Sequence, residues 1–229
     1  MIAVRLTEVR SRIATAARSV GRAPSSIQLI AVSKTCPLDA IRDAYAAGQR
    51  DFGENRVQEA LEKIGRATEP EIRWHLLGHL QTNKARKVAG VFTSVQSIDS
   101  IELLHKLDRA ALEIGTTQDV LIQVAVAHET TKFGMPPADV PRLFEAGARL
   151  DAARVVGLMT IPPPAQTPED ARPWFRRLRE LRDAWQASGV PATMLCELSM
   201  GMSGDFEVAI QEGATIVRVG TAIFGTRAP

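Results

Sequence analysis

Short apolar runs alternate with amphipathic segments along nearly the whole chain. The apolar runs predict eight strands, at residues 28–34, 50–53, 72–78, 91–95, 119–126, 153–159, 193–198 and 215–219. Between them, apolar residues recur at helical spacing, which predicts helices at 38–47, 55–66, 82–89, 99–114, 137–147, 168–187 and 205–212. Strand and helix therefore alternate from the first strand to the last.

This alternation is typical of βαβ units and a parallel sheet. Eight strands agree with a closed (β/α)₈ TIM barrel, which we expect to occupy residues 1–229 as one domain. A doubly wound open sheet is the alternative, but no G-x-G-x-x-G motif follows the first predicted strand. We therefore favour the closed barrel.

The first 22 residues leave two interpretations open. They contain five arginines and one glutamate, and an Arg-rich, acid-poor start is typical of an organelle transit peptide. However, apolar residues recur there at steps of three and four, at Leu6, Val9, Ile13, Ala17 and Val20. We favour an extra N-terminal helix that packs this stripe on the barrel.

Composition narrows the class of protein. The chain has 229 residues, is 45% hydrophobic and 24% charged, and carries a net charge of +2, as expected for a soluble globular protein. The two cysteines, Cys36 and Cys196, form no metal or disulfide spacing, which fits a reducing cytoplasmic location. No apolar run approaches the roughly 20 residues that span a bilayer, so no membrane association is expected.

The arginine-rich segment 168–187 raises the question of nucleic-acid binding, because Trp174 and Phe175 could stack on bases. Trp174, Leu178, Leu181 and Trp185 instead form an inward helical stripe. The arginines then fall on a solvated face, and no nucleic-acid partner is expected.

Lys34 is the first candidate for chemistry, which in such a barrel gathers at the C-terminal ends of the strands. Period-two alternation places Lys34 on the same face as Ile30 and Val32, inside the barrel. Desolvation there favours the neutral, nucleophilic amine that a Schiff base needs. The alternative is that Lys34 lies just past the strand and is solvated.

The loops after the seventh and eighth predicted strands suit a phosphate. The run from Ser199 to Gly204 holds two serines and two glycines before a predicted helix, and N–H groups at a helix N-terminus bind phosphate. Barrel closure should bring Gly220 and Thr221 near Lys34. A plain N-cap at Ser203 and plain turns at the glycines are the simpler interpretation.

Arg218 alternates with its neighbours along the eighth predicted strand, so its side chain should point into the barrel. A buried arginine stays charged and needs a partner. That partner is either a carboxylate, Glu197 or Asp51, or the ring nitrogen of a pyridine cofactor. A lysine amine, a phosphate site and an inward arginine together describe pyridoxal 5′-phosphate (PLP).

Seven sequence blocks that carry these residues resemble the YggS/PROSC family of pyridoxal phosphate homeostasis proteins. That family shares its barrel with the N-terminal domain of alanine racemase. The blocks cover nearly the whole chain, and they are AVSKT at 31–35, FGENRVQEA at 52–60, WHLLGHLQTNK at 74–84, KFGM at 132–135, GLMTI at 157–161, SMGMSGDFEVAI at 199–210 and RVGTAIFG at 218–225.

The resemblance implies that PLP forms a Schiff base on Lys34 and that Arg218 faces the pyridine nitrogen. It also implies a phosphate site made by Ser199, Gly220 and Thr221, with Ser203 close by. The resemblance further implies a role in intracellular PLP homeostasis, for which PLP-dependent apoenzymes are the expected recipients.

Two further residues, Asn55 and His75, match family positions that line the cofactor pocket. His75 and His79 are four residues apart, but they fall on a predicted strand and lack the glutamate of the H-E-x-x-H helix motif. No metal site is therefore expected.

A PLP carrier or regulator is favoured over an enzyme. Racemases with the related barrel take a second base, a tyrosine, from a separate C-terminal domain, whereas this chain ends shortly after Val219. The lone tyrosine, Tyr45, falls within a predicted helix. Lys132 is either a substitute base, a second amine that receives PLP, or a solvated loop lysine. We expect a monomer without catalytic residues.

Two other functions remain as alternatives. The first is a PLP-dependent enzyme acting on amino acids, such as a weak racemase. The second is an aldolase-type barrel that binds phosphosugars through a Schiff base without PLP.

Overall fold

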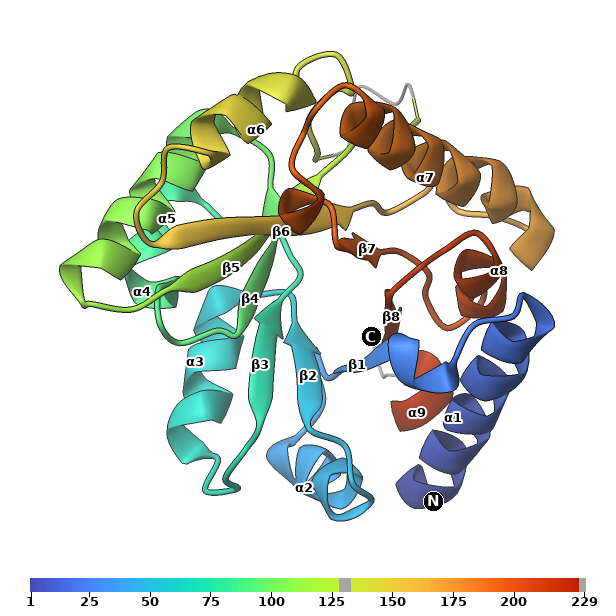
Figure 1. The fold of residues 1–229 in the computed structure, drawn as a ribbon. Helices are drawn as coiled ribbons and strands as arrows, with labels where there is room; N and C mark the ends of the chain where they lie inside the picture. Colours follow the sequence, from blue (N-terminus) through green and yellow to red (C-terminus); the bar gives the residue numbers. More distant parts are fainter. Residues whose placement is uncertain (128–132, 227–229) are drawn as a thin grey trace.

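Eight parallel strands pair in sequence order, and β8 pairs with β1 to close a barrel (Figure 1). The structure is a computed structural model that describes residues 1–127 and 133–226. The strands are β1 Gln28–Val32, β2 Asp51–Glu54, β3 Arg73–Leu76, β4 Ser94–Ile98, β5 Gln118–Gln123, β6 Ala153–Met159, β7 Glu197–Ser199 and β8 Ile216–Val219. The predicted (β/α)₈ TIM barrel is confirmed.

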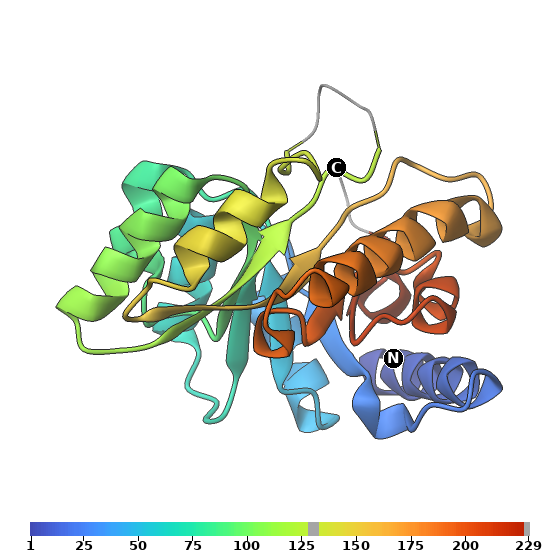
Figure 2. The same ribbon diagram turned by 45° about the horizontal axis from the view of Figure 1, so that its top comes forward.

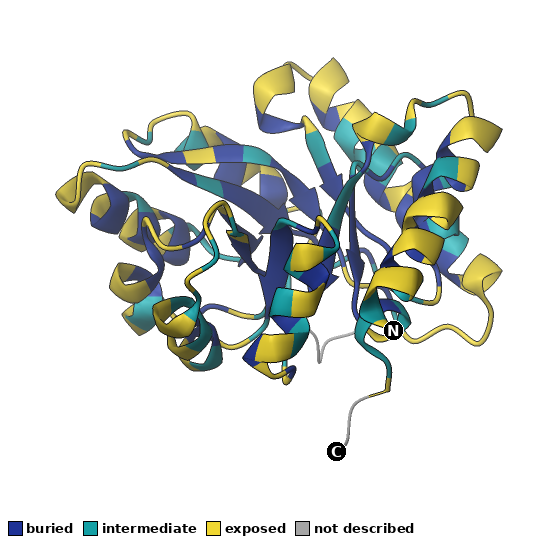
Figure 3. Cartoon of the chain, turned by 90° about the horizontal axis from the view of Figure 1, so that it is seen from below, coloured by how far each residue is buried: buried dark blue, intermediate teal, exposed yellow. Residues whose placement is uncertain are grey.

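Helices surround the barrel and present their exposed faces to solvent, while the strands are buried (Figure 3). The α-helices are α1 Ile2–Ser19, α2 Leu38–Ala46, α3 Val57–Arg66, α4 Ala85–Val88, α5 Ile101–Glu113, α6 Val140–Gly147, α7 Arg172–Ala187, α8 Phe206–Gln211 and α9 Thr221–Phe224. Short 3₁₀ turns occur at Pro24–Ser26, Thr82–Lys84, Pro168–Ala171 and Ala192–Met194.

The extra N-terminal helix is also confirmed. Helix α1 lies against α8 and α9 on the outside of the barrel (Figure 2). Leu6, Val9 and Ile13 of its apolar stripe are buried, as is Ala17. Val20 lies at the C-cap and is exposed, so the stripe ends one turn earlier than predicted.

The arginine-rich segment 168–187 folds as a 3₁₀ turn followed by α7. Phe175, Leu178 and Trp185 are the buried residues of this helix. Arg176 and Arg179 pair with Glu212 beyond α8. The helix therefore packs through an apolar stripe, as predicted for Leu178 and Trp185, but Phe175 is buried in place of the predicted Trp174, and Leu181 is half-buried.

Two predicted strands are displaced. The fourth covers Ser94–Ile98 rather than 91–95, because its inward positions are polar and give no hydrophobic signal. The seventh has three residues, Glu197–Ser199, because the chain after Pro191 first forms a 3₁₀ turn. Both shifts bring polar side chains to positions inside the barrel.

The strand register shows which side chains point inward, because residues paired across parallel strands share a face. Ile30 pairs with Arg218, and Val32 pairs with Gly53. Gly53 pairs in turn with His75, and His75 with Ser94. The interior is therefore part polar, beside an apolar cluster made of Ile30, Val32, Leu77, Leu121, Met159 and Ile216.

The described part of the chain contains neither a membrane-spanning helix nor a metal-binding cluster. No helix in residues 1–127 and 133–226 is long and apolar enough to cross a membrane. Within the same ranges, no group of three or more His, Cys, Asp or Glu side chains is arranged to hold a metal ion.

Close approach of β6 and β7 requires a glycine. Gly157 pairs with Glu197, and a Cβ on Gly157 would lie 2.2 Å from the carbonyl oxygen of Glu197. Gly157→Ala should therefore lower the free energy of unfolding by about 1–3 kcal/mol, as overpacking does. Denaturant unfolding followed by circular dichroism measures this change.

Gly65→Ala is the matched control. Gly65 is an exposed residue of α3, and a Cβ there meets no atom within 4 Å. The same substitution should stabilise the protein by about 0.5 kcal/mol, through the entropy of the unfolded chain. Equal effects at the two glycines would contradict the close β6–β7 contact.

Candidate functional site

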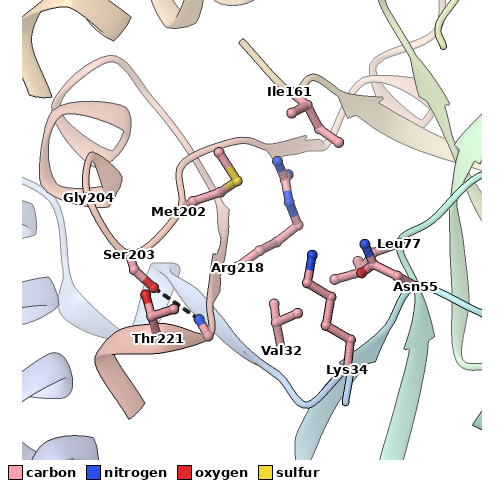
Figure 4. Close-up of a pocket in the computed structure, with 11 residues that line it drawn as sticks. Val32, Lys34, Asn55, Leu77, Ile161, Met202, Ser203, Gly204, Arg218 and Thr221 are labelled. Atoms are coloured by element: carbon pink, nitrogen blue, oxygen red, sulfur yellow. Dashed lines mark hydrogen bonds between the residues drawn. The ribbon is translucent and has the colours of Figure 1, made fainter. Parts of the chain in front are cut away.

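A cavity of about 310 Å³ opens where β1 and β8 end, and its size suits a small organic ligand (Figure 4). Segments that follow six of the strands contribute to it, which is the usual place for a site in this fold. Its lining consists of Val32, Lys34, Asn55, Leu77, Ile161, Met202, Ser203, Gly204, Arg218, Gly220 and Thr221.

Six of the eight cofactor-binding residues predicted from the sequence line this cavity. They are Lys34, Asn55, Ser203, Arg218, Gly220 and Thr221. Ser199 and His75 lie deeper in the barrel and are 0% and 2% exposed. Lys132 lies outside the described residues.

Lys34 lies in a turn that follows β1. The strand ends at Val32, and the N–H of Cys36 donates to the carbonyl of Ser33 at 2.9 Å to close the turn. The amine of Lys34 projects into the cavity toward Arg218 and Asn55 (Figure 4). Both sequence interpretations thus hold in part, since Lys34 is past the strand, half-buried, and aimed inward.

The turn stores backbone strain beside the amine. Thr35 has φ of 60°, in the left-handed region that a β-branched residue rarely adopts. Such conformations persist where neighbouring groups hold them, and they gather at functional sites. Here Glu59 of α3 accepts the N–H of Thr35.

Lys63 of α3 ties this turn to β2. Its ammonium donates to the carbonyl of Ser33 at 2.8 Å, to Glu54 at 2.8 Å and to Glu59 at 2.7 Å. The hydroxyl of Ser33 donates to Glu54 at 2.7 Å. One ammonium and two carboxylates therefore fix the backbone on which Lys34 is carried.

Glu54 is the most deeply buried member of this group, with none of its surface exposed. Burial raises the pKa of Glu54, and hydrogen bonds from Lys63 and Ser33 offset only part of the effect. Among the described residues, the Oε2 atom of Glu54 is buried without a hydrogen-bond partner.

An anion-binding geometry lies on the other side of the cavity. The N–H groups of Gly220 and Ala222 both donate to the hydroxyl oxygen of Ser203, at 3.1 and 3.3 Å (Figure 4 shows the first). Two N–H groups that converge on one oxygen also suit a phosphate oxygen. Thr221 lies between them and adds a hydroxyl at the cavity wall.

A glycine sets the path of the Ser203 loop. Gly201 has φ of 93°, and a Cβ there would lie 2.5 Å from the Cβ of Ala209 on α8. The loop can therefore lie flat on α8 only with glycine at this position. The N–H of Met202 then donates to Asp205 at 2.6 Å, and the loop carries Ser203 to the cavity.

Arg218 provides the positive charge inside the barrel. Its guanidinium donates to the hydroxyl of Ser199 at 2.7 Å and to the carbonyl of Thr160 at 2.8 Å. Burial lowers the pKa of Arg218 to about 10, while the Asp205 carboxylate acts in the opposite direction. The side chain is 4% exposed and remains charged at neutral pH.

The alternative that Arg218 pairs with Asp51 or Glu197 is not supported, because both carboxylates bond to other side chains. Asp51 lies at the start of β2 and accepts hydrogen bonds from Arg73 and His75. Glu197 lies at the start of β7 and accepts one from Thr215. Both carboxylates are at the opposite ends of their strands from the cavity.

His75 and Ser199 act inside the barrel rather than at the cavity wall. The His75 ring lies between the Ser94 hydroxyl, 2.8 Å from Nδ1, and the Asp51 carboxylate, 3.0 Å from Nε2. The hydroxyl of Ser199 donates to Gln96 at 2.6 Å. Both predicted residues are thus linked to the site only through other side chains.

Sequence reasoning placed Val32 inside the barrel but missed the rest of the apolar lining and one backbone contact. Leu77 is at an inward position that period-two alternation could have identified, whereas Ile161 and Met202 are in loops without periodicity. Gly78 is needed because a Cβ there would lie 2.0 Å from the carbonyl oxygen of Asn55.

Comparison with known proteins shows which proteins the whole chain resembles. Residues 4–228 match the family described as "Alanine racemase, N-terminal domain". A protein of Aquifex aeolicus named "Pyridoxal phosphate homeostasis protein" is 46% identical over 223 residues, which cover 97% of this chain and 97% of the relative.

Solved structures agree with this match. PipY of Synechococcus elongatus PCC7942, without PLP, is 44% identical and has a TM-score of 0.88, with 98% of this chain and 100% of PipY covered. PipY with PLP bound is 43% identical and has a TM-score of 0.85, with the same shares of 98% and 100% covered.

The Lys63 contacts generate a pH-dependent prediction. Lys63→Met leaves the buried Glu54 carboxylate without its cation, which should destabilise the protein by about 3 kcal/mol at pH 7. Because the pKa of Glu54 is raised on folding, its neutral form is favoured by the folded state. Stability should therefore return as the pH falls from above the raised pKa toward the ordinary carboxyl value.

Urea unfolding of the variant between pH 4 and pH 8 measures this dependence. Lys106→Met is the control, because Lys106 pairs with Glu102 on the exposed surface of α5, where a pair contributes little. A Lys63→Met protein with wild-type stability at pH 7 would show that the contacts of Lys63 with Glu54 and Glu59 do not support the turn that carries Lys34.

Proposed function

The chain belongs to the alanine racemase N-terminal domain family and, within it, to the pyridoxal phosphate homeostasis proteins, and on this premise we propose that it binds PLP as a Schiff base on Lys34. One observation carries the proposal. The amine of Lys34, the guanidinium of Arg218 and the N–H of Gly220 border a single cavity of about 310 Å³.

The donor set of the cavity fits the three polar ends of PLP. Lys34 is the amine for the aldehyde, and Arg218 is a donor for the ring nitrogen. Ser203, Gly220 and Thr221 are on the side where the phosphate would bind. When bound, PLP supplies an electrophilic aldehyde and a ring that can accept electrons.

Asn55 lines the cavity beside Lys34 (Figure 4), and we assign it a contact with the cofactor. We assign His75 and Ser199 an indirect role, since both are buried behind the wall. The apolar side chains of Val32 and Leu77 would pack against the ring and shield it from water.

The same residues favour a carrier over an enzyme. A guanidinium donor opposite the ring nitrogen opposes protonation of that nitrogen, and an unprotonated ring is a weaker electron sink. Tyr45, the single tyrosine, lies on α2, where Arg50 stacks over its ring at 4.0 Å. It is absent from the cavity lining, so it does not supply a second base there.

The rim of the cavity is compatible with transfer of PLP to recipient apoenzymes. Ile161 and Met202 on this rim are 43% and 38% exposed, and Lys34 is half-buried. A bound aldehyde at this position would be accessible to an incoming amine. We therefore propose that the protein holds PLP reversibly for PLP-dependent enzymes.

Lys34→Ala should abolish the visible absorbance that PLP gives on the wild-type protein, and it should leave the far-UV circular dichroism unchanged. Lys34→Arg is the matched control, since it keeps the positive charge but removes the nucleophilic amine. Borohydride reduction of the wild-type protein, followed by mass mapping, should place the label on Lys34. A label on another lysine, with unchanged absorbance in both variants, would contradict the proposal.

Turnover distinguishes a carrier from an enzyme. The PLP-loaded protein, incubated with a panel of L- and D-amino acids, should give no racemisation, transamination or decarboxylation near roughly 1 per second, within the ordinary range for enzymes. Chiral chromatography measures the first reaction and keto-acid or amine release the others. Turnover at that rate, lost in Lys34→Ala, would favour the weak racemase or another PLP enzyme.

A further inference from the structure

A chain of hydrogen-bonded side chains crosses the barrel interior behind Arg218. Successive distances from the Arg218 end are 2.7, 2.6, 3.3, 2.8 and 3.0 Å. Each side chain belongs to a residue that is at most 7% exposed. In order, the members are Arg218, Ser199, Gln96, Ser94, His75 and Asp51.

The donors in this chain all point the same way. A guanidinium can only donate, so Ser199 accepts from Arg218 and its own hydroxyl proton goes to Gln96 Oε1. Gln96 Nε2 then donates to Ser94, whose proton is left for Nδ1 of His75. With Ser94 donating to Nδ1, a neutral His75 ring has its proton on Nε2 and donates it to Asp51.

The far end is a fixed anion. Asp51 also accepts two hydrogen bonds from Arg73, at 2.8 and 2.6 Å, and one from Gln28 at 2.9 Å. Burial raises the pKa of Asp51, but the hydrogen bonds from His75 and Arg73 outweigh it and hold the pKa well below its usual range. The chain thus runs from a buried cation to a carboxylate that stays ionised.

Alignment of these dipoles has an energetic consequence for Arg218. In a low-dielectric interior, hydrogen bonds in series polarise one another. The negative charge on Asp51 therefore strengthens the acceptor that Ser199 offers to the guanidinium. The same contacts keep two arms of the guanidinium in place and leave the rest of it facing the cavity.

We propose that Gln96, Ser94 and His75 are positioning residues that fix the orientation and donor strength of Arg218 toward the cofactor ring. The inference rests on the proposed function, because it concerns how the cavity holds the PLP ring. If the hydrogen-bond chain is broken at Gln96, the Ser199 hydroxyl loses its acceptor and can turn, and Thr160 remains as the acceptor of Arg218 that does not depend on this chain. The guanidinium is then held less firmly, and its orientation toward the cavity becomes more variable.

If these polar side chains only filled the barrel interior, substituting one of them would lower stability without a specific effect on PLP binding. Gln96→Met interrupts the chain with little change of volume. Gln118→Met is the matched control. Gln118 is also 0% exposed, but its amide donates to the backbone carbonyls of Phe92 and Asp119 and takes no part in the hydrogen-bond chain behind Arg218. Both substitutions remove a buried amide, so both should lower the unfolding midpoint.

Of these two variants, only Gln96→Met should change the binding and the absorption of PLP. We expect PLP affinity, titrated by fluorescence, to fall about tenfold, the scale of a lost hydrogen bond to a charged group. The visible band of the bound cofactor should shift as well. Ser94→Ala, a smaller change, should reproduce the weaker binding if Gln96→Met fails to fold.

A measurement on the protein without PLP tests the chain independently. Imidazole nitrogen NMR should show His75 with its proton on Nε2 and Nδ1 accepting, and Gln96→Met should perturb the Nδ1 signal. Wild-type affinity, band and imidazole signals in Gln96→Met would overturn the inference and leave the proposed function intact. A wild-type protein that gives no band dependent on Lys34 would refute the proposed function instead.

Discussion

Burial of a positive charge at Arg218 is the constraint on which the rest of the site depends. An isolated ion in an apolar interior is very costly, so such a charge persists only where hydrogen-bond acceptors surround it. The barrel meets this requirement with Ser199, Thr160 and the side chains behind them, while the Asp205 carboxylate, which forms no ion pair with Arg218 within the described residues, acts on it through its charge. The interior is consequently divided between a polar region and an apolar cluster that includes Ile30 and Met159.

The two basic side chains of the cavity, Arg218 and Lys34, are positioned by different contacts. Arg218 projects from a strand and is fixed by buried side chains, which suits a group that must keep one orientation. Lys34 projects from a strained turn that Lys63 and two carboxylates support from outside the barrel. The amine of Lys34 is half-buried and so nearer to solvent than the guanidinium of Arg218, which is buried.

These arrangements together favour retention of PLP over catalysis. In the proposed binding mode the guanidinium would face the ring nitrogen and limit electron withdrawal, and the described residues that line the cavity include no tyrosine to act as a second base. Full-length similarity to pyridoxal phosphate homeostasis proteins agrees with this conclusion.

The amino-acid sequence by itself determined the alternation of strands and helices, the N-terminal helix, and the convergence of Lys34, Arg218 and the loops that follow β7 and β8. Local periodicity suffices for these features, because it shows which face of each element is buried. Only the tertiary structure decided the partners of Arg218 and the place of β4. Ser94 and Gln96 point inward but are polar, so they leave no hydrophobic signal. Gln96 meets Ser199 across 103 residues of sequence, and that contact depends on the register of a closed barrel rather than on any local pattern.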